Sequence, residues 1–279
     1  MSGGKLFIVA TPIGNLEDVT IRAIRILKEA SLIAAEDTRH TKKLLDHYGI
    51  ATPLTSYHEH NEREKAKHLV GRLMEGADIA LVSDAGTPGI SDPGYRLVKL
   101  AVENSIPVIA IPGPSAIISL VAISGLPTDR FTFMGFPPEK ESQLKALFKE
   151  ISAQAHTYIF YESPNRIKAT LETMLEGLGD IQAVIGRELT KMHEEVLRGK
   201  VTEVIAALAN RDIKGEITLV IRTEERAKGD FRPALEGLLA SGAKLNDAVK
   251  AVAKDFNLPR AEVYREALAI KERIKEAAE

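Results

Sequence analysis

The chain of 279 residues contains no cysteine. Disulfide bonds, thiolate chemistry and cysteine-bound zinc are therefore excluded, and the composition fits a reducing compartment. No apolar run approaches the roughly 20 residues that span a bilayer, and the first residues lack the basic segment and apolar stretch of a secretory signal. We therefore expect a cytoplasmic protein with no membrane partner.

The chain also lacks a strong excess of charge, because 37 lysine and arginine residues nearly balance 39 aspartate and glutamate residues. No global basic field indicates nucleic acid, although a local basic patch fits within a neutral total. The two commonest phosphate-binding patterns, G-x-G-x-x-G and G-x-x-x-x-G-K-[ST], are absent as well. A phosphate-using enzyme such as a nucleotide kinase is therefore disfavoured.

The first half of the chain alternates short apolar stretches with helical spacing. Strands are predicted at 5–10, 32–35, 78–83 and 108–111, and helices at 18–29, 95–103 and after residue 115. This alternation predicts a mostly parallel sheet with helices on both faces.

A second α/β layer is predicted after residue 124. Its strands are expected at 130–135, 157–161, 181–186 and 216–222, and its helices at 142–152, 167–177 and 202–210. The polar stretch 223–230 is typical of a linker, and helices are predicted at 233–239, 245–256 and 260–271. The last two resemble a small helix-turn-helix, and a structural cap or a dimerisation arm fits the pattern as well. The fold class is therefore α/β, with domains at 1–118 and 119–224 and a helical extension at 230–279.

Three loops of the first domain share a chemistry rich in glycine and proline. They are 11–15, 83–89 and 112–116, and each follows a strand and leads into a helix. In an open α/β sheet, ligands bind outside the carboxyl ends of the strands, where glycine lets backbone groups approach them. Asp84 and Asp92 would repel a phosphate but suit hydroxyls, amines or a cation. A nucleoside-like ligand fits best, with ordinary βα turns as the alternative.

Five motifs identify a family. TPIGNLED (11–18), AEDTR (35–39), SDAGTPGISDPG (83–94), IPGPSA (111–116) and FYESPNR (160–166) resemble the tetrapyrrole-methylase superfamily, and within it most closely the branch of small-subunit ribosomal RNA methyltransferases. The resemblance implies two α/β domains with S-adenosylmethionine bound in the cleft between them, and a homodimer. It also implies methyl transfer to the ribose 2′-hydroxyl of a cytidine in the decoding region of 16S rRNA.

The resemblance also implies which residues form the donor pocket. In the first domain they are Pro12, Asp84, Ala85, Gly86, Ser115 and Ala116, and in the second Met134, Gly135, Phe136, Tyr161, Gly215, Glu216 and Ile217. Alternatively, Met134 and Phe136 are core residues, and Tyr161 is a core residue whose hydroxyl bonds to the backbone.

Candidates for the proton acceptor are Glu36, Asp37, Glu188 and His193. Surface ion pairs with Arg39 or Arg187 explain the three carboxylates equally well. Basic residues beside the loops are candidates for holding RNA phosphates: Arg39, Lys42, Lys43, Arg187 and Lys191. A helix face with balanced charge is the alternative. Asn165 and Arg166 are expected either to reach the RNA or to cap the helix that follows.

Other functions remain open at this point. His58 and His60 suggest a metal, but no further ligand falls at a suitable spacing, so we predict a solvated loop and no metal. A methylase of a tetrapyrrole or of a protein side chain would share the donor cleft. A non-enzymatic protein that binds nucleic acid through the terminal helices is the alternative from another class.

Overall fold

The computed structural model describes residues 3–224, 231–256 and 258–276. They form two compact units. The first contains the residues up to Ser152 together with His156–Thr223, and the second contains Ala153–Ala155 and the described residues from Glu224 onward. Most of the expected linker, residues 225–230, and residue 257 of the expected turn lie outside the described residues.

The first sheet is wholly parallel, as predicted. Its strand order is β3-β2-β4-β1-β5, and each pairing between neighbours is parallel. The strands are β1 (Leu6–Val9), β2 (Leu32–Ala35), β3 (Leu54–Ser56), β4 (Ile79–Val82) and β5 (Val108–Ile111). The central strands are buried on both faces, which explains why they are short continuous apolar runs rather than alternating ones.

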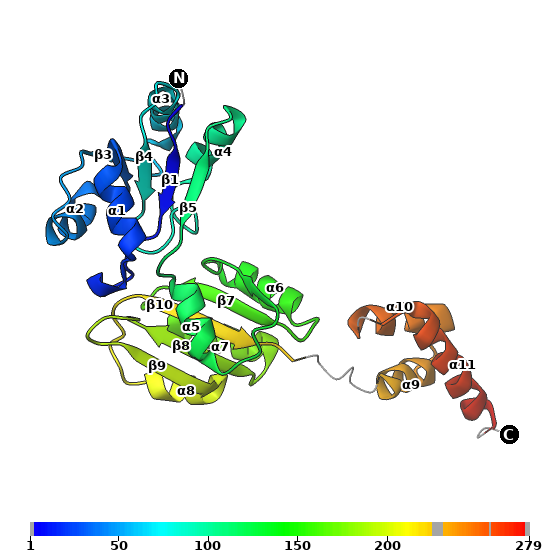
Figure 1. The fold of residues 1–279 in the computed structure, drawn as a ribbon. Coiled ribbons are helices and arrows are strands. Elements are labelled where there is room, and N and C mark those ends of the chain that lie inside the picture. Colours follow the sequence, from blue (N-terminus) through cyan, green and yellow to red (C-terminus); the bar gives the residue numbers. More distant parts are fainter. Residues whose placement is uncertain (1–2, 225–230, 257, 277–279) are drawn as a thin grey trace. The chain divides into compact units, whose positions relative to one another are not determined.

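Two helix layers cover this sheet (Figure 1). The helices are α1 (Ile21–Glu29), α2 (Thr38–His47), α3 (Glu62–Met74) and α4 (Tyr95–Glu103), with a short 3₁₀ helix, η1, at Leu16–Asp18. Side chains of α1 and α2 pack with Phe7, Val9 and Ile33 of one sheet face. Those of α3 and α4 pack with Leu6, Leu32 and Ile79 of the other. The predicted loops follow the carboxyl ends of β1, β4 and β5.

The second sheet is mixed, with the order β6-β7-β10-β8-β9. Only the pairing of β6 with β7 is parallel, and the other three are antiparallel. The strands are β6 (Phe131–Phe133), β7 (Thr157–Glu162), β8 (Gln182–Arg187), β9 (Glu195–Lys200) and β10 (Ile217–Arg222). The helices are α5 (Ala116–Ser124), α6 (Glu141–Ile151), α7 (Ile167–Leu178) and α8 (Val201–Leu208).

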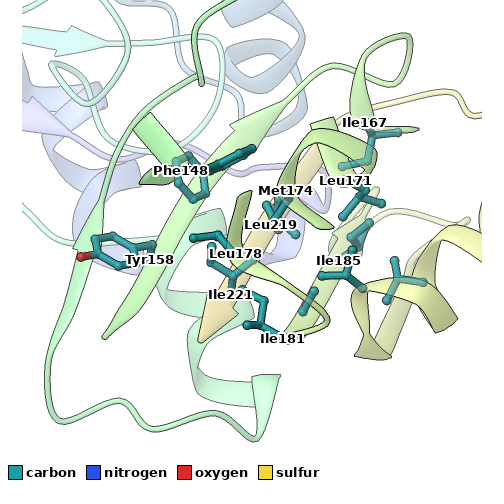
Figure 2. Packing of buried hydrophobic residues seen from close by; sticks show 14 of the residues in the cluster. Phe148, Tyr158, Ile167, Leu171, Met174, Leu178, Ile181, Ile185, Leu219 and Ile221 are labelled. Carbon is teal, nitrogen blue, oxygen red and sulfur yellow. The ribbon is translucent and has the colours of Figure 1, made fainter. Parts of the chain in front are cut away.

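The two faces of the second sheet have separate cores. On one face, Phe148 of α6 and Leu171 and Met174 of α7 pack against Leu219 and Ile221 of the central strand (Figure 2). On the other face, Ile117, Leu120 and Val121 of α5 pack against Ile159, Val184 and Val220. Helix α5 thus begins before residue 118, where the sequence suggested a boundary, and its apolar side chains cover the second sheet.

Within the described residues, the helices of the second unit are α9 (Arg232–Ala240), α10 (Leu245–Asp255) and α11 (Arg260–Glu276). All three contribute to one small core around Leu235, Val252 and Val263. No helix of the described chain is long and apolar enough to cross a membrane.

Candidate functional site

Two of the predicted loops are joined by backbone hydrogen bonds at the carboxyl edge of the first sheet. The Thr11 amide donates to the Gly86 carbonyl over 2.8 Å, and the Gly86 amide donates to the Thr11 carbonyl over 3.0 Å. Gly86 has a φ of +75°, which only glycine adopts without strain. The loops after β1 and β4 therefore form one wall rather than two independent turns.

A cavity of about 300 Å³ opens beside this wall. Its lining comes from the β1 and β4 loops, from α2, and from the loops after β8 and before β10. The lining residues are Thr11, Pro12, Ile13, Gly14, Leu16, His40, Thr41, Lys43, Leu44, Ser83, Asp84, Ala85, Lys191 and Glu216. Of the residues predicted for the donor, Pro12, Asp84, Ala85 and Glu216 line the cavity, and of those predicted for RNA, Lys43 and Lys191 do.

The carboxyl groups of Glu36, Asp84 and Asp92 lie close together beside the loop after β4. The Asp37 amide donates to Asp84 Oδ1 over 3.0 Å, and the Asp84 amide donates to Glu36 Oε2 over 3.5 Å. Burial, followed by the neighbouring Asp84 charge, raises the pKa of Glu36. Burial and the Glu36 charge raise the pKa of Asp92 to about 6. A site that holds several carboxylates so close together favours a positively charged ligand.

Asp37 has a structural role in this arrangement. Its Oδ1 accepts from the Arg39 amide over 2.8 Å, which caps α2, and its other oxygen pairs with the Arg39 guanidinium over 2.7 Å. These bonds hold the pKa of Asp37 well below its usual range. The ion-pair interpretation therefore describes Asp37, whose carboxylate is a weak proton acceptor.

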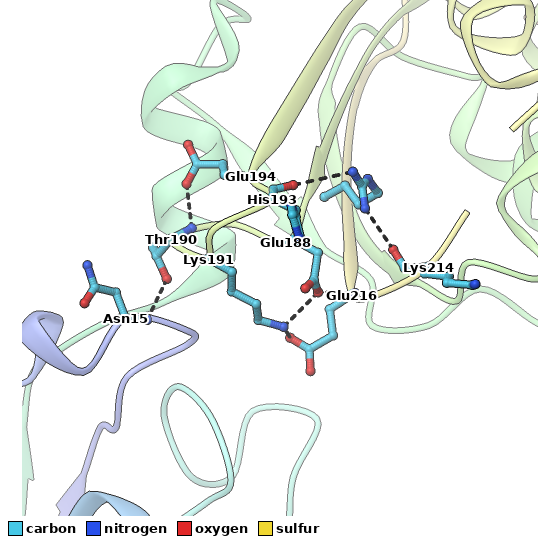
Figure 3. Close-up of polar contacts among 9 residues, drawn as sticks. Asn15, Glu188, Thr190, Lys191, His193, Glu194, Lys214 and Glu216 are labelled. Carbon is cyan, nitrogen blue, oxygen red and sulfur yellow. Dashed lines mark hydrogen bonds and ion pairs between the residues drawn. The ribbon is translucent and has the colours of Figure 1, made fainter. Parts of the chain in front are cut away.

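Lys191 lies between two glutamates at the cavity (Figure 3). Its Nζ is 2.8 Å from Glu188 Oε1 and 3.1 Å from Glu216 Oε2, and Glu188 Oε1 also accepts from the Glu216 amide over 2.9 Å. The hydrogen bond from Lys191 lowers the pKa of Glu188, so Glu188 is, like Asp37, a weak proton acceptor.

The loop that carries Lys191 is held to the first domain. The Asn15 amide donates to Thr190 Oγ1 over 3.1 Å (Figure 3). A Cβ added at Gly14 would lie 2.4 Å from Lys191 Cγ and 2.9 Å from Thr190 Oγ1. Glycine at position 14 therefore lets the β1 loop approach the lysine.

The Arg187 side chain makes polar contacts with three neighbouring residues. The Arg187 guanidinium bonds Glu195 over 3.1 Å and the carbonyls of Lys214 and His193 over 3.3 and 3.4 Å. The His193 side chain is exposed. Arg187 thus ties together the turn between β8 and β9 and the segment before β10.

Apart from Glu216, the donor positions predicted in the second domain fall outside the cavity lining. Tyr161 packs its ring against Phe133 and Phe136, with centroids 4.9 and 5.7 Å apart. Burial, then the charges of Asp92 and Glu216, raise the pKa of Tyr161 to about 12. The side chain of Phe136 is exposed, so its interpretation as a core residue is wrong, whereas Met134 packs against a core.

At the remaining positions predicted for the donor pocket, most side chains have structural roles. Ser115 caps α5, accepting from the Ile118 amide over 3.4 Å, and Ala116 packs against the core under that helix. Ile217 is buried. Gly135 and Gly215 have φ values of +69° and +90°, so both need glycine, and the space around the Gly135 α-carbon is open.

The other residues predicted for RNA differ in how freely they face solvent. Lys42 pairs with Asp46 along α2 over 2.8 Å, and the Arg39 side chain is highly exposed beside Asp37. Arg166 donates to the carbonyls of Pro137 and Pro138 and pairs with the buried Glu162. No side chain caps the start of α7, so the expected cap from Asn165 is not formed.

The sequence interpretation missed cavity residues on α2. Thr41 is 3 % exposed, and its hydroxyl has no partner among the described residues although it belongs to the cavity lining. The sequence did contain a signal for this helix. Asp37 is a typical N-cap residue, and Thr41, Leu44 and Leu45 follow it at helical spacing. Within the described residues, no cluster of three or more His, Asp or Glu side chains is arranged to hold a metal ion.

Comparison with known proteins agrees with this geometry. The pattern of the family Tetrapyrrole (Corrin/Porphyrin) Methylases matches residues 5–205. The chain is 49 % identical to ribosomal RNA small subunit methyltransferase I of Halalkalibacterium halodurans, over 94 % of this chain and 93 % of the relative. It is 47 % identical to the protein of the same name from Thermotoga maritima, over 80 % of this chain and the whole relative.

A solved structure of diphthine synthase shares the fold. Its TM-score is 0.60 at 14 % identity, and the match covers 79 % of this chain and 90 % of the other. At that identity the likeness concerns the arrangement of strands and helices alone. Taken with the family pattern and the two relatives, it leads to one conclusion: the chain belongs to the tetrapyrrole methylase family and, within it, to the group of ribosomal RNA small subunit methyltransferase I.

Proposed function

We propose that the protein is an S-adenosylmethionine-dependent methyltransferase that methylates the ribose 2′-hydroxyl of a cytidine in the decoding region of 16S rRNA. The observation that carries the proposal is the lining of the cavity, which combines the loop of Asp84 with the cations Lys43 and Lys191. A cationic methyl donor is favoured by nearby carboxylates, and a polyanionic acceptor by nearby lysines, so both kinds of group are needed at one site. The names of the relatives support RNA of the small ribosomal subunit as the acceptor.

The residues present fit such a donor. S-adenosylmethionine, when bound, supplies a methyl group on a positively charged sulfonium, and it carries no phosphate. The carboxyl groups of Glu36 and Asp92 have raised pKa values because negative charge is crowded there. A cationic ligand would relieve that crowding. Phe136 and Tyr161 add an aromatic surface, of which the Phe136 ring is 57 % exposed. We assign the donor to these residues and to the backbone of the Gly86 loop.

Lys43 and Lys191 are proposed to hold the phosphates that flank the target ribose. Lys43 is exposed, and Lys191 is fixed by Glu188 and Glu216. Fixing the acceptor beside the donor contributes most to the rate, since orientation supplies roughly 7–11 kcal/mol of a barrier. A general base typically adds about 10²–10⁴-fold.

Glu36 is the proposed acceptor of the 2′-hydroxyl proton. Of the acidic candidates, it alone has a raised pKa, whereas those of Asp37 and Glu188 are lowered. A carboxylate whose pKa lies closer to neutrality is the better base. Glu36→Gln is expected to lower kcat by about 10²–10⁴-fold.

The test is methyl transfer from radiolabelled S-adenosylmethionine to 30S subunits that lack this modification. Protein-free 16S rRNA and a porphyrin precursor serve as parallel acceptors, and labelled RNA is digested to nucleosides. Label on a cytidine ribose supports the proposal. Label on the porphyrin, or none on RNA despite donor binding, refutes it in favour of a small-molecule or protein acceptor.

A donor-site variant provides an independent check. Gly86→Val forces a β-branched side chain into a φ of +75°, which distorts the loop that carries Asp84. Calorimetric titration with S-adenosylmethionine should show lost affinity in a protein that still unfolds cooperatively. Wild-type affinity in that variant would remove the loop from the donor site.

We further propose a homodimer. The segment around α4 exposes large apolar side chains at Tyr95 and Val102, which are 70 % and 62 % exposed, and at Ile90. Exposed apolar side chains gathered on one element favour an interface between subunits. Light scattering coupled to size-exclusion chromatography should give twice the chain mass of 30.4 kDa, and Tyr95→Glu with Val102→Glu should give the monomer mass.

A further inference from the structure

The C-terminal unit carries an open groove between α10 and α11. Lys250 lies on α10, and Arg260, Tyr264, Arg265 and Leu268 lie on α11. The α11 residues follow a spacing of three and four, so they form one stripe along the helix. None of them belongs to the core of the unit, which the opposite faces of the helices form.

Three cations of the groove are available for a ligand. Lys250, Arg260 and Arg265 are exposed. Within the described residues no hydrogen bond or ion pair engages their side chains, in contrast to Arg232, which pairs with Glu266. The one acidic residue of the groove is Asp247. The groove is therefore a local basic site in a chain whose net charge is −2.

An aromatic ring lies among these cations. Tyr264 is 41 % exposed and Leu268 is 42 % exposed. Alternation of cations with an exposed aromatic ring is how single-stranded nucleic acids are held, because the cations neutralise phosphates and the ring stacks on a base. A second copy of the same groove would instead bring like charges together.

The relative from Thermotoga maritima indicates what the unit adds. It is matched over its whole length but over only 80 % of this chain, and the family pattern ends at residue 205. The part without a counterpart has the size of the C-terminal unit. The residues that line the cavity all belong to the first unit.

We infer that the groove between α10 and α11 docks an unpaired stretch of ribosomal RNA, with phosphates on Lys250, Arg260 and Arg265 and a base stacked on Tyr264. The inference rests on the proposed function for the identity of the RNA. Docking at a second position lets the full chain hold the ribosomal subunit while the cavity engages the target nucleotide.

The first experiment measures binding of the full-length chain to a fluorescein-labelled twelve-nucleotide uridine strand by fluorescence anisotropy at several salt concentrations. The test variant is Lys250→Gln, Arg260→Gln, Arg265→Gln, and the matched control is Lys244→Gln, Lys254→Gln, Lys271→Gln. The control cations lie on the same helices or just before them and do not line the groove. The slope of log Kd against log salt should fall by about 2 in the test variant only, at about 0.7 for each phosphate contact.

A second pair of variants tests the stacking. Tyr264→Ala should weaken binding of the uridine strand by roughly 5- to 100-fold, whereas Tyr264→Phe should bind like wild type. Thermal unfolding of each variant separates misfolding from lost contacts. Unchanged affinity and salt slope in both test variants would overturn the inference.

The second experiment places the groove in the reaction. With unmodified 30S subunits, the test variants should raise KM at least about tenfold with kcat unchanged, since about three phosphate contacts are lost. A raised KM for 30S subunits without weaker binding of the uridine strand or of protein-free 16S rRNA would assign the groove to a ribosomal protein and overturn the inference. Failure of the wild type to methylate any RNA contradicts the proposed function instead, and leaves the anisotropy result to stand separately.

Discussion

Asp92→Asn should stabilise the protein, and the effect should depend on pH. Asp92 is partly buried beside Glu36 and Asp84, and these surroundings raise the pKa of its carboxyl from 3.8 to about 6. At neutral pH the group is ionised in both folded and unfolded chains. Its charge is then held in a place that disfavours it, so removing the charge removes an unfavourable contribution to folding.

The sign and size of this change in stability follow from the linkage between proton binding and folding. Because the folded pKa is higher than the unfolded one, the native state binds more protons between about pH 4 and pH 6, and stability falls as pH rises through that window. The unfavourable contribution is absent below the unfolded pKa and complete above the folded one. About two pKa units correspond to at most about 3 kcal/mol. Since the side chain is partly exposed and screened by solvent, we expect about 1 kcal/mol.

Urea unfolding at pH 4.5 and pH 8 measures the difference. The free energy of unfolding of Asp92→Asn should exceed that of wild type by about 1 kcal/mol at pH 8 and by much less at pH 4.5. Asp129→Asn, at an exposed aspartate, is the matched control and should change stability little at either pH. If Asp92→Asn changed the free energy of unfolding equally at both pH values, or lowered it at pH 8, the electrostatic account would be refuted.

Three further variants test other contacts. Glu162→Gln should lower the free energy of unfolding in urea by about 1–3 kcal/mol. The fully buried Glu162 carboxylate accepts hydrogen bonds from the Ser163 amide and the Thr170 hydroxyl over 2.7 and 2.6 Å. An unchanged free energy of unfolding would contradict this reasoning. Gly215→Ala should lower Tm, since the φ of Gly215 is +90° and the new Cβ would lie 2.3 Å from Glu188 Oε1. The control Gly237→Ala, in open space on α9, should not lower Tm. Lys191→Met should raise KM for rRNA and reduce the salt slope by about 1, with unchanged donor affinity; an unchanged KM removes Lys191 from RNA binding.

The strands β1, β2, β4 and β5 of the first sheet were predictable because they are short continuous apolar runs. Continuous apolar runs at 32–35 and 108–111 match β2 and β5, and Tyr95–Glu103 matches α4 at both ends. In these segments burial, propensity and flanking loops agree. The direction of the strands also followed, since alternation with helices requires parallel crossovers.

Other elements were missed because their apolar signal is weak. The helices α2 and α3, whose faces are mostly charged, lay in a stretch left without a secondary-structure prediction, as did the short strand β3. The strand β9 lies at the edge of its sheet and has no fully buried residue. An edge strand of polar residues differs little in sequence from a loop. The antiparallel pairing of the second sheet likewise depends on contacts that periodicity does not report.

The candidate site could be predicted loop by loop but not as an assembly. The motifs located Pro12 and Asp84, which both line the cavity. The contact between Gly14 and Lys191, and the crowding of Glu36 with Asp92, join residues far apart in the chain. The first contact depends on how the two domains pack, and the second on the pairing of β2 with β4 in one sheet; no local pattern encodes either.

The turn that carries Lys191 illustrates what packing adds. Glu188 and Thr190 both adopt left-handed backbone, with φ of +51° and +67°, at a cost of roughly 1–2 kcal/mol each. The conformation persists because the turn is bonded on every side: Lys191 pairs with Glu188 and Glu216, Thr190 accepts from Asn15, and the Thr190 amide donates to Glu194 over 2.5 Å. A turn held in this way presents one lysine position to the cavity. Because a fixed cation loses little conformational entropy on binding a phosphate, this turn would favour the contact with an RNA phosphate that we propose for Lys191.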